Sequence, residues 1–176
     1  MSSVEALMHC AGCAPATSKS TATTGGLVSG MAAELRAAYP DAVIRTSGNG
    51  LSIPQTGYNG FPVGLIVLEN GVFYLNLGWA EFEVHDRQTA LDLLILGFSR
   101  VCRLRTTHIG GRLRDWFLDM HTTHDWHCIH SGGLARFAPW RTVEEEQRAN
   151  FRPLTTLGEA ARCRILVHFQ VPGSEI

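Results

Sequence analysis

Two stretches of the chain alternate between apolar and polar residues around a glycine-containing turn, which is the pattern of a β-hairpin. The first spans residues 63–77 and has Asn70-Gly71 at its centre. Asn-Gly favours a two-residue type I′ turn, because both turn positions need positive φ. Such a turn pairs Leu68 with Phe73. It predicts one wholly apolar face, made of Ile66, Leu68, Phe73, Leu75 and Leu77.

The second predicted hairpin spans residues 101–121, around Ile109-Gly-Gly111. A three-residue loop would gather the apolar side chains on one face, namely Cys102, Leu104, Trp116, Leu118 and Met120. The same pairing would put Arg105 opposite Asp115 on the other face. Because a two-residue loop would divide the apolar set between both faces, the longer loop is predicted.

Three other stretches carry helical signals. In residues 27–38, apolar side chains recur every four residues. Residues 87–99 follow Asp86, a good N-cap, and are apolar on nearly every side, which predicts a buried helix. The capping box Thr142-Val-Glu-Glu145 predicts a short helix over residues 143–150.

The remaining pattern completes an α+β fold with an antiparallel sheet. Residues 162–171 alternate between apolar and polar side chains and predict a half-buried strand. Hairpins imply antiparallel pairing, and the helices are expected to cover the sheet. Residues 1–24 are rich in Ser, Thr and Ala and are expected to form a flexible leader. We therefore predict a single domain over residues 25–176 of this 176-residue chain.

Composition places the chain among ordinary globular proteins. It is 45% hydrophobic and 18% charged, with a formal net charge of −1. This balance argues against partners that bind through bulk charge, so neither nucleic acid nor a membrane is expected. The odd number of cysteines, five, and the lack of a secretory signal predict reduced thiols and a cytoplasmic location. Cys10 and Cys13 have Cys-x-x-Cys spacing, which we interpret as incidental because no second pair accompanies them.

A run of histidines is the most conspicuous candidate for chemistry, with His121, His124, His127 and His130 within ten residues. Histidine is the commonest metal ligand, and three or four such ligands would make a zinc site. A spacing of three residues sends the side chains in different directions on a helix and on a strand, so all four cannot bind one ion. The metal hypothesis therefore uses His121, His124 and His127, with Cys128 or Asp125 in support.

Five arginines crowd the second hairpin, namely Arg100, Arg103, Arg105, Arg112 and Arg114. Because Arg103 and Arg105 would share a face with acidic residues of the opposite strand, we interpret them as cross-strand charge pairs. The sequence has no Gly-x-Ser-x-Gly elbow, Walker loop or dinucleotide-binding glycine motif. No catalytic residue and no cofactor are predicted, with zinc as the alternative.

Four aromatic residues mark where a partner or small molecule would bind. Tyr74 and Phe117 fall on the outer faces of the predicted hairpins, where exposed apolar area is typical of an interface. Trp79 and Trp116 would line a pocket between the sheet and the helix over residues 87–99.

A series of motifs runs through residues 58–150. They are Asn59-Gly-Phe-Pro-Val63, Gly78-Trp79, Glu81-Phe-Glu83, Ala90-Leu91, Leu96-Gly-Phe-Ser-Arg-Val-Cys-Arg-Leu-Arg105, Trp116, Trp140 and Glu144-Glu-Glu-Gln-Arg-Ala-Asn150. In this order they resemble a group of small, uncharacterised bacterial α+β proteins. Immunity-type proteins, which neutralise bacterial toxins, often have this size and architecture. The resemblance implies a compact bacterial domain without chemistry, and it carries no catalytic residues across.

These observations favour a non-enzymatic binding protein, either immunity-like or another protein-interaction module. Its expected partner is another protein or a second copy in a homodimer. One alternative is a metal-binding protein or metal-dependent enzyme that uses the histidine run. Another is a small-molecule-binding domain.

Overall fold

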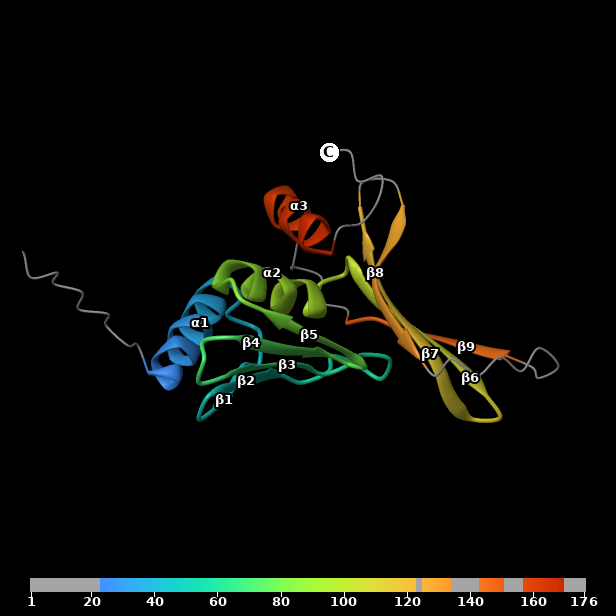
Figure 1. Ribbon diagram of the computed structural model, residues 1–176, viewed down its shortest axis with the longest axis horizontal. Coiled ribbons are helices and arrows are strands. Elements are labelled where there is room, and N and C mark those ends of the chain that lie inside the picture. The colour runs from blue at the N-terminus through green and yellow to red at the C-terminus, as the bar shows by residue number, and fades with distance from the viewer. Residues whose placement is uncertain (1–22, 123–124, 134–142, 151–156, 170–176) are drawn as a thin grey trace, which may run out of the picture.

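The computed structural model describes residues 23–122, 125–133, 143–150 and 157–169. Within these ranges the chain forms three helices and two antiparallel sheets, of five and four strands (Figure 1). The prediction of an α+β fold is therefore confirmed, with two sheets in place of one. None of the described helices is long and apolar enough to span a membrane. Residues 1–22 of the predicted leader, with Cys10 and Cys13, lie outside the described part.

The first sheet is a meander in which each strand pairs with the next one in the sequence. Its strands are β1 (Arg45–Ser47), β2 (Gly50–Ile53), β3 (Val63–Val67), β4 (Phe73–Leu77) and β5 (Ala80–Val84). Short connections favour this order, because neighbouring antiparallel strands need no crossover. Helices α1 (Thr24–Ala38) and α2 (Arg87–Phe98) cover one side, which we call the inner face (Figure 1).

Both covering helices form where the sequence predicts them. Asp86 caps α2, since its carboxylate accepts hydrogen bonds from the Thr89 amide at 2.7 Å and the Thr89 hydroxyl at 2.8 Å. A Cβ on Gly97 would come within 2.9 Å of Val63 Cγ2, so the glycine lets α2 approach the sheet closely. The residues of α1 that are buried are Val28, Met31, Ala32 and Leu35.

The register predicted for the first hairpin is wrong by one residue. Val67 pairs with Phe73, and the Leu68 amide donates to the Val72 carbonyl at 2.8 Å, so the loop has three residues. Gly71 supplies positive φ (81°) and the Asn70 side chain accepts a hydrogen bond from the Val72 amide at 3.1 Å. As a result Leu65 and Val67 face the core, whereas Ile66 and Leu68, predicted to be inside, are 45% and 36% exposed.

The physical reason for that error lies in β3 itself. Both of its faces are apolar over residues 65–68, so the hydrophobic pattern is satisfied by either register. Asn49 favours the observed one, because its side-chain amide donates to the Val67 carbonyl at 2.8 Å and its own carbonyl accepts from the Val67 amide at 2.9 Å. These contacts come from the preceding turn and are invisible to a hairpin considered alone.

The second sheet has the strand order β8-β7-β6-β9. Its strands are β6 (Cys102–Ile109), β7 (Arg112–His121), β8 (Trp126–Gly133) and β9 (Val143–Arg148). The predicted three-residue loop between β6 and β7 is wrong, because Ile109 pairs with Arg112 across a two-residue Gly110-Gly111 turn. A β-bulge between Thr107 and His108 then shifts the register.

This bulge restores the predicted face of the second hairpin. Beyond it Cys102 pairs with Met120 and Leu104 with Leu118, so the predicted apolar residues share one face after all. The predicted pairing of Arg105 is wrong, since Arg105 lies opposite Phe117 and Asp115 lies opposite Thr107. A two-residue turn alone would have turned these apolar side chains to different faces. The extra residue on one strand at the bulge puts them on one face again.

The helix predicted over residues 143–150 is wrong, because residues 143–148 form β9 and pair with β6. This segment carries three consecutive glutamates and few apolar residues, so a helix there would have no apolar stripe to bury. Pairing satisfies the backbone groups along the free edge of β6 instead. Glu146 and Arg148, two residues apart on the strand, form an ion pair of 2.9 Å on one face.

The strand predicted over residues 162–171 is also wrong, because Glu159–His168 form helix α3. Ala161 and Ile165, one helical turn apart, are buried, whereas Val167, which a strand would have buried, is 69% exposed. The segment carries both an alternating and a helical pattern, and packing decides between them. α2 provides the packing surface, and Arg164 Nε lies 2.6 Å from Asp92 Oδ2.

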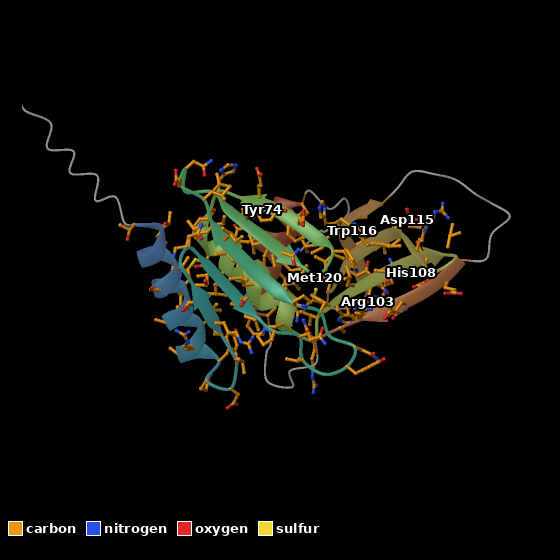
Figure 2. All side chains as sticks on the ribbon, turned by 90° about the horizontal axis from the view of Figure 1, so that it is seen from below. Tyr74, Arg103, His108, Asp115, Trp116 and Met120 are labelled. Atoms are coloured by element: carbon orange, nitrogen blue, oxygen red, sulfur yellow. The ribbon has the colours of Figure 1, made fainter. Side chains whose placement is uncertain are left out.

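One hydrophobic core continues through both sheets. Met120 is fully buried and lies close to where the sheets meet (Figure 2). The buried Asn150 side chain, just after β9, joins distant segments of the chain. Its amide nitrogen donates to the Phe61 carbonyl at 2.7 Å and to the Gly97 carbonyl at 2.9 Å. The end of the second sheet is thereby tied to α2 and to the loop before β3.

Candidate functional site

The side of the first sheet that points away from α1 and α2 is the candidate site, and we call it the outer face. Strand alternation places ten residues on it, in two rows that cross all five strands. The arginine row consists of Arg45, Ser52, Gly64, Asn76 and Glu81. The isoleucine row consists of Ser47, Gly50, Ile66, Tyr74 and Glu83.

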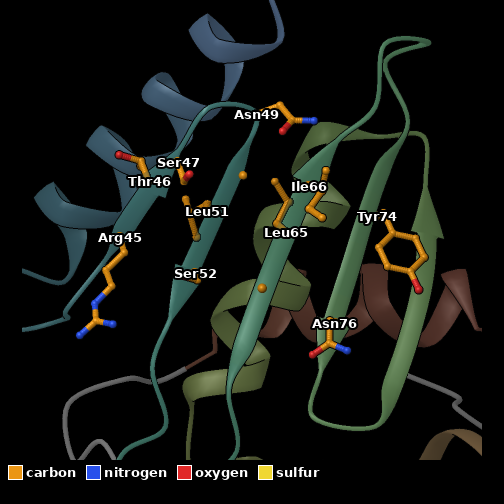
Figure 3. Close-up of a pocket in the computed structure, with 12 residues that line it drawn as sticks. Arg45, Thr46, Ser47, Asn49, Leu51, Ser52, Leu65, Ile66, Tyr74 and Asn76 are labelled. Atoms are coloured by element: carbon orange, nitrogen blue, oxygen red, sulfur yellow. The ribbon is translucent and has the colours of Figure 1, made fainter.

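A hollow of about 390 Å³ lies within the outer face (Figure 3). Gly50 and Gly64 lie diagonally across β2 and β3, and the hollow exists because neither has a side chain to fill it. Ile66, Tyr74 and Asn76 stand beside it, and in Figure 3 the helices lie behind the sheet, away from the hollow. Two glycines thus leave a depression beside two large side chains.

Apolar side chains occupy the middle of the outer face. Ile66 is 45% exposed and pairs directly with Tyr74 on β4. A hydrogen bond with the Glu81 carboxylate, followed by burial and nearby negative charge, raises the pKa of Tyr74. The hydroxyl therefore stays protonated at neutral pH and the ring presents an apolar surface with one polar atom.

Charge is divided between the two edges of the outer face. Arg45 stands on β1 at one edge, whereas Glu81 and Glu83 stand on β5 at the other. Four strand spacings of about 4.8 Å separate these edges by roughly 19 Å. Within the described residues neither Arg45 nor Glu83 forms an ion pair, so these charges are available to a partner.

The second sheet carries a charged cluster that is satisfied internally. Asp119, whose side chain is 2% exposed, accepts from Arg103 Nε at 2.8 Å and from Arg105 Nε at 2.5 Å. Its carboxylate raises the pKa of Arg105. The arginines also cover aromatic rings, with Arg103 over Trp126 at 4.2 Å and Arg105 over Phe117 at 4.9 Å. The predicted cross-strand charge pairing is confirmed, with Asp119 as its centre.

The histidines of the metal hypothesis are divided between two sides of the second sheet. His121 pairs with Trp126, while the next residue on β8, His127, pairs with Met120, so their side chains leave opposite faces. His124 lies outside the described residues. Among the described residues no group of three or more His, Cys, Asp or Glu side chains is placed to hold a metal ion. The zinc site stays a prediction.

An aromatic cluster around His130 was missed by the sequence reasoning. The His130 ring lies 4.8 Å from Phe82, 5.2 Å from Trp116 and 5.7 Å from Phe169, measured between ring centres. Burial lowers the pKa of His130, which favours the neutral ring. The cluster joins β5, β7, β8 and the residue after α3, and its contacts come from segments far apart in the sequence.

The four predicted aromatic positions have different surroundings. Tyr74 lines the hollow, and Phe117 lies under the Arg105 guanidinium. Trp79 is in the β4–β5 turn and 54% exposed, whereas Trp116 packs against Gly132, where a Cβ would lie 2.5 Å from its ring. The lining of the hollow on the outer face includes neither Trp79 nor Trp116, and the pocket predicted at these two residues stays a prediction.

The sequence did contain one signal for this hollow. Gly50 and Gly64 both occur within strand-forming segments, where glycine often marks a close approach or a missing side chain. Their adjacency depends on the register between β2 and β3, which the sequence pattern does not specify. No protein-family model, curated protein or solved structure matches this chain.

Proposed function

We propose that the chain is a non-enzymatic binding protein, a protein-interaction module whose contact surface is the outer face of the first sheet. The observation that carries the proposal is the 45% exposure of Ile66 beside Tyr74 and the hollow. An antiparallel sheet with one solvated face normally alternates apolar inside with polar outside. Here Ile66, Leu68 and Tyr74 depart from that alternation on the outer face.

The arrangement of the outer face suits a protein surface as partner. An aromatic side chain and an aliphatic one lie at the centre, with Arg45, Glu81 and Glu83 towards the edges. Protein interfaces commonly have such an apolar centre and polar rim, and tyrosine is enriched among the residues that dominate binding. An immunity-like role would be one form of this function, because immunity-type proteins act by binding.

The test is site-specific photocrosslinking in the native cells. A photoreactive phenylalanine analogue in place of Ile66 is expected to give an adduct with a defined protein. The matched control carries the same analogue in place of Val167, which is 69% exposed. Val167 belongs to α3, and this helix lies on the opposite side of the first sheet from the outer face (Figure 1). Adduct formation at position 66 but not at position 167 supports the proposal.

The adduct then has to be reproduced with purified components. The captured protein should bind the wild-type chain, and Tyr74→Ala should weaken the affinity about tenfold or more, as expected for a central aromatic contact. Thermal unfolding of the variant serves as the folding control. Equal crosslinking at both positions, or none at position 66, contradicts the proposal.

A further inference from the structure

Each of the two rows of the outer face is complementary to the same row of a second copy of the chain. We propose that the partner of this face is a second copy of the chain, packed outer face against outer face. This inference rests on the proposed function, because it names the occupant of the same surface. It is carried by the strand order and register, which together determine which residues would meet.

A two-fold axis that lies between the sheets and runs within about 15° of the direction of β3 generates the arrangement. Since β3 is the middle strand of five, the rotation places β1 of one copy over β5 of the other and β2 over β4. Positions along the strands are kept, so each row meets the same row of the second copy. Such an interface uses one patch on both copies, which is the commonest symmetry of homo-oligomers.

In the arginine row this symmetry brings opposite charges together. Arg45 of each copy faces Glu81 of the other, so one dimer contains two such pairs. Gly64, on the central strand, faces its own equivalent and allows close approach. Ser52 faces Asn76, and both side chains can donate and accept hydrogen bonds.

In the isoleucine row the symmetry places a large side chain of one copy opposite the hollow of the other. Tyr74 of each copy faces Gly50 of the other, where the missing side chain opens the hollow. Ile66 faces its own equivalent and forms an apolar centre. Ile66, Tyr74 and the hollow are thus accounted for by one arrangement.

The usual geometry of packed sheets permits these contacts. Two aligned sheets lie about 10 Å apart and cross at about −30°. Residues near the axis stay opposite one another, whereas the crossing angle displaces facing residues at the edges by roughly 5 Å. The long side chain of Arg45 spans such an offset, and it reaches towards Glu83 as well as Glu81.

The size of the sheet sets the expected strength of the dimer. Five strands about 4.8 Å apart and three to five residues long present roughly 350 Å² per copy. A stable standard-size interface uses about 800 Å² per partner, so the dimer should be weak. Association should therefore depend strongly on protein concentration.

Sedimentation velocity of the full chain between about 5 μM and about 1 mM tests this inference. The 19.3 kDa monomer should convert to a species of twice its mass as the concentration rises. Arg45→Glu and Glu81→Arg should each weaken the dimer about tenfold, since each puts like charges in both facing pairs. Both sites are exposed, which keeps the variants folded.

Mixing the two variants makes the test specific. In a heterodimer of Arg45→Glu with Glu81→Arg, both facing pairs again have opposite charges, so an equimolar mixture should recover wild-type association. The double variant should recover it as well. Arg112→Glu at the tip of the β6–β7 hairpin reverses a charge away from the outer face and should leave the association unchanged.

If the chain stays monomeric over the whole concentration range, the inference that a second copy is the partner is wrong. It is also wrong if a dimer forms whose affinity these charge changes leave unaltered. These failures differ from failure of the proposed function. A chain that remains monomeric but crosslinks through position 66 to a different protein retains the function and loses only this inference. Absence of any adduct at position 66 removes the binding surface itself.

Discussion

Arg105 and Asp119 form the tightest charged contact of the second sheet, with Arg105 Nε 2.5 Å and Nη2 3.1 Å from the two carboxylate oxygens. The Asp119 side chain is 2% exposed and the Arg105 side chain 26%. Arg103, directly opposite Asp119 on β6, adds a second cation. A buried carboxylate is thereby surrounded by donors, and the sheet depends on its presence.

Removing Asp119 should strongly destabilise the protein. Asp119→Ala leaves Arg103 and Arg105 without their shared acceptor, and loss of one partner from a buried ionic cluster costs about 3 kcal/mol. Urea unfolding measures this loss. The control is Glu145→Gln, because Glu145 is 49% exposed and 3.8 Å from Arg105, and it should change the free energy of unfolding by less than about 0.5 kcal/mol. Equal effects of the two variants would contradict the role of Asp119.

Two glycine-to-alanine changes in helices should have opposite signs. Gly97→Ala on α2 places a Cβ 2.9 Å from Val63 Cγ2 and 3.0 Å from Leu77, which should destabilise by about 1–3 kcal/mol. Gly30→Ala on α1 meets no atom within 4 Å and should stabilise by about 0.5–1 kcal/mol. Thermal unfolding of both variants checks the close packing of α2 on the sheet. A stabilised Gly97→Ala variant would mean that α2 lies farther away.

His130 should make stability depend on pH. Burial lowers the pKa of His130 in the folded state below its ordinary value of 6.5. At pH values near and below 6.5, the unfolded chain therefore binds more protons than the folded protein. The free energy of unfolding should fall as the pH drops through 6.5. His130→Phe retains an aromatic ring without the titrating group.

The measurement for His130 is chemical unfolding between about pH 7.5 and about pH 5.5. The free energy of unfolding of the wild type, relative to that of His130→Phe, should decrease towards the acidic end. The comparison removes the other histidines, which both proteins share. A difference that stays constant, or grows as the pH falls, would show that the folded state accepts the charged ring.

The metal alternative leads to its own measurement. Because His121 and His127 leave opposite faces of the second sheet, a single ion should not bind both of them. Protein purified without a histidine tag should contain much less than one zinc per chain, and the variants His121→Ala, His124→Ala and His127→Ala should have the same low content. Elemental analysis gives the answer. One zinc per chain that is lost in these variants would establish the metal site instead.

Some features of the fold could be predicted because their causes are local. Asp86 and the apolar residues after it specify α2, since capping and burial act within one segment. The shared face of Leu104, Leu118 and Met120 was predictable as well, because the core requires these apolar side chains to point to the same side of the sheet. The length of the loop was not predictable, because a two-residue turn with a β-bulge and a three-residue turn place the same side chains on one face.

Other features carried two patterns at once. The segment around Ile165 alternates like a strand and also repeats like a helix, and packing against α2 selects the helix. The segment around Glu145 has a helix-start motif but no apolar stripe, and the free edge of β6 selects the strand. In both cases the deciding partner is distant in the sequence.

By itself the sequence determined the α+β class, the helices that cover the first sheet and the residues available to be buried, because these follow from local propensity and hydrophobic periodicity. Only the tertiary structure decided what faces outward. The apolar residues 65–68 satisfy either register, and contacts of Asn49 with Val67 turn Ile66 away from the core. The same register places Gly50 and Gly64 diagonally across β2 and β3, and it aligns Arg45 with Glu81 across the sheet. A binding surface made of strand pairings exists only once the strands have paired.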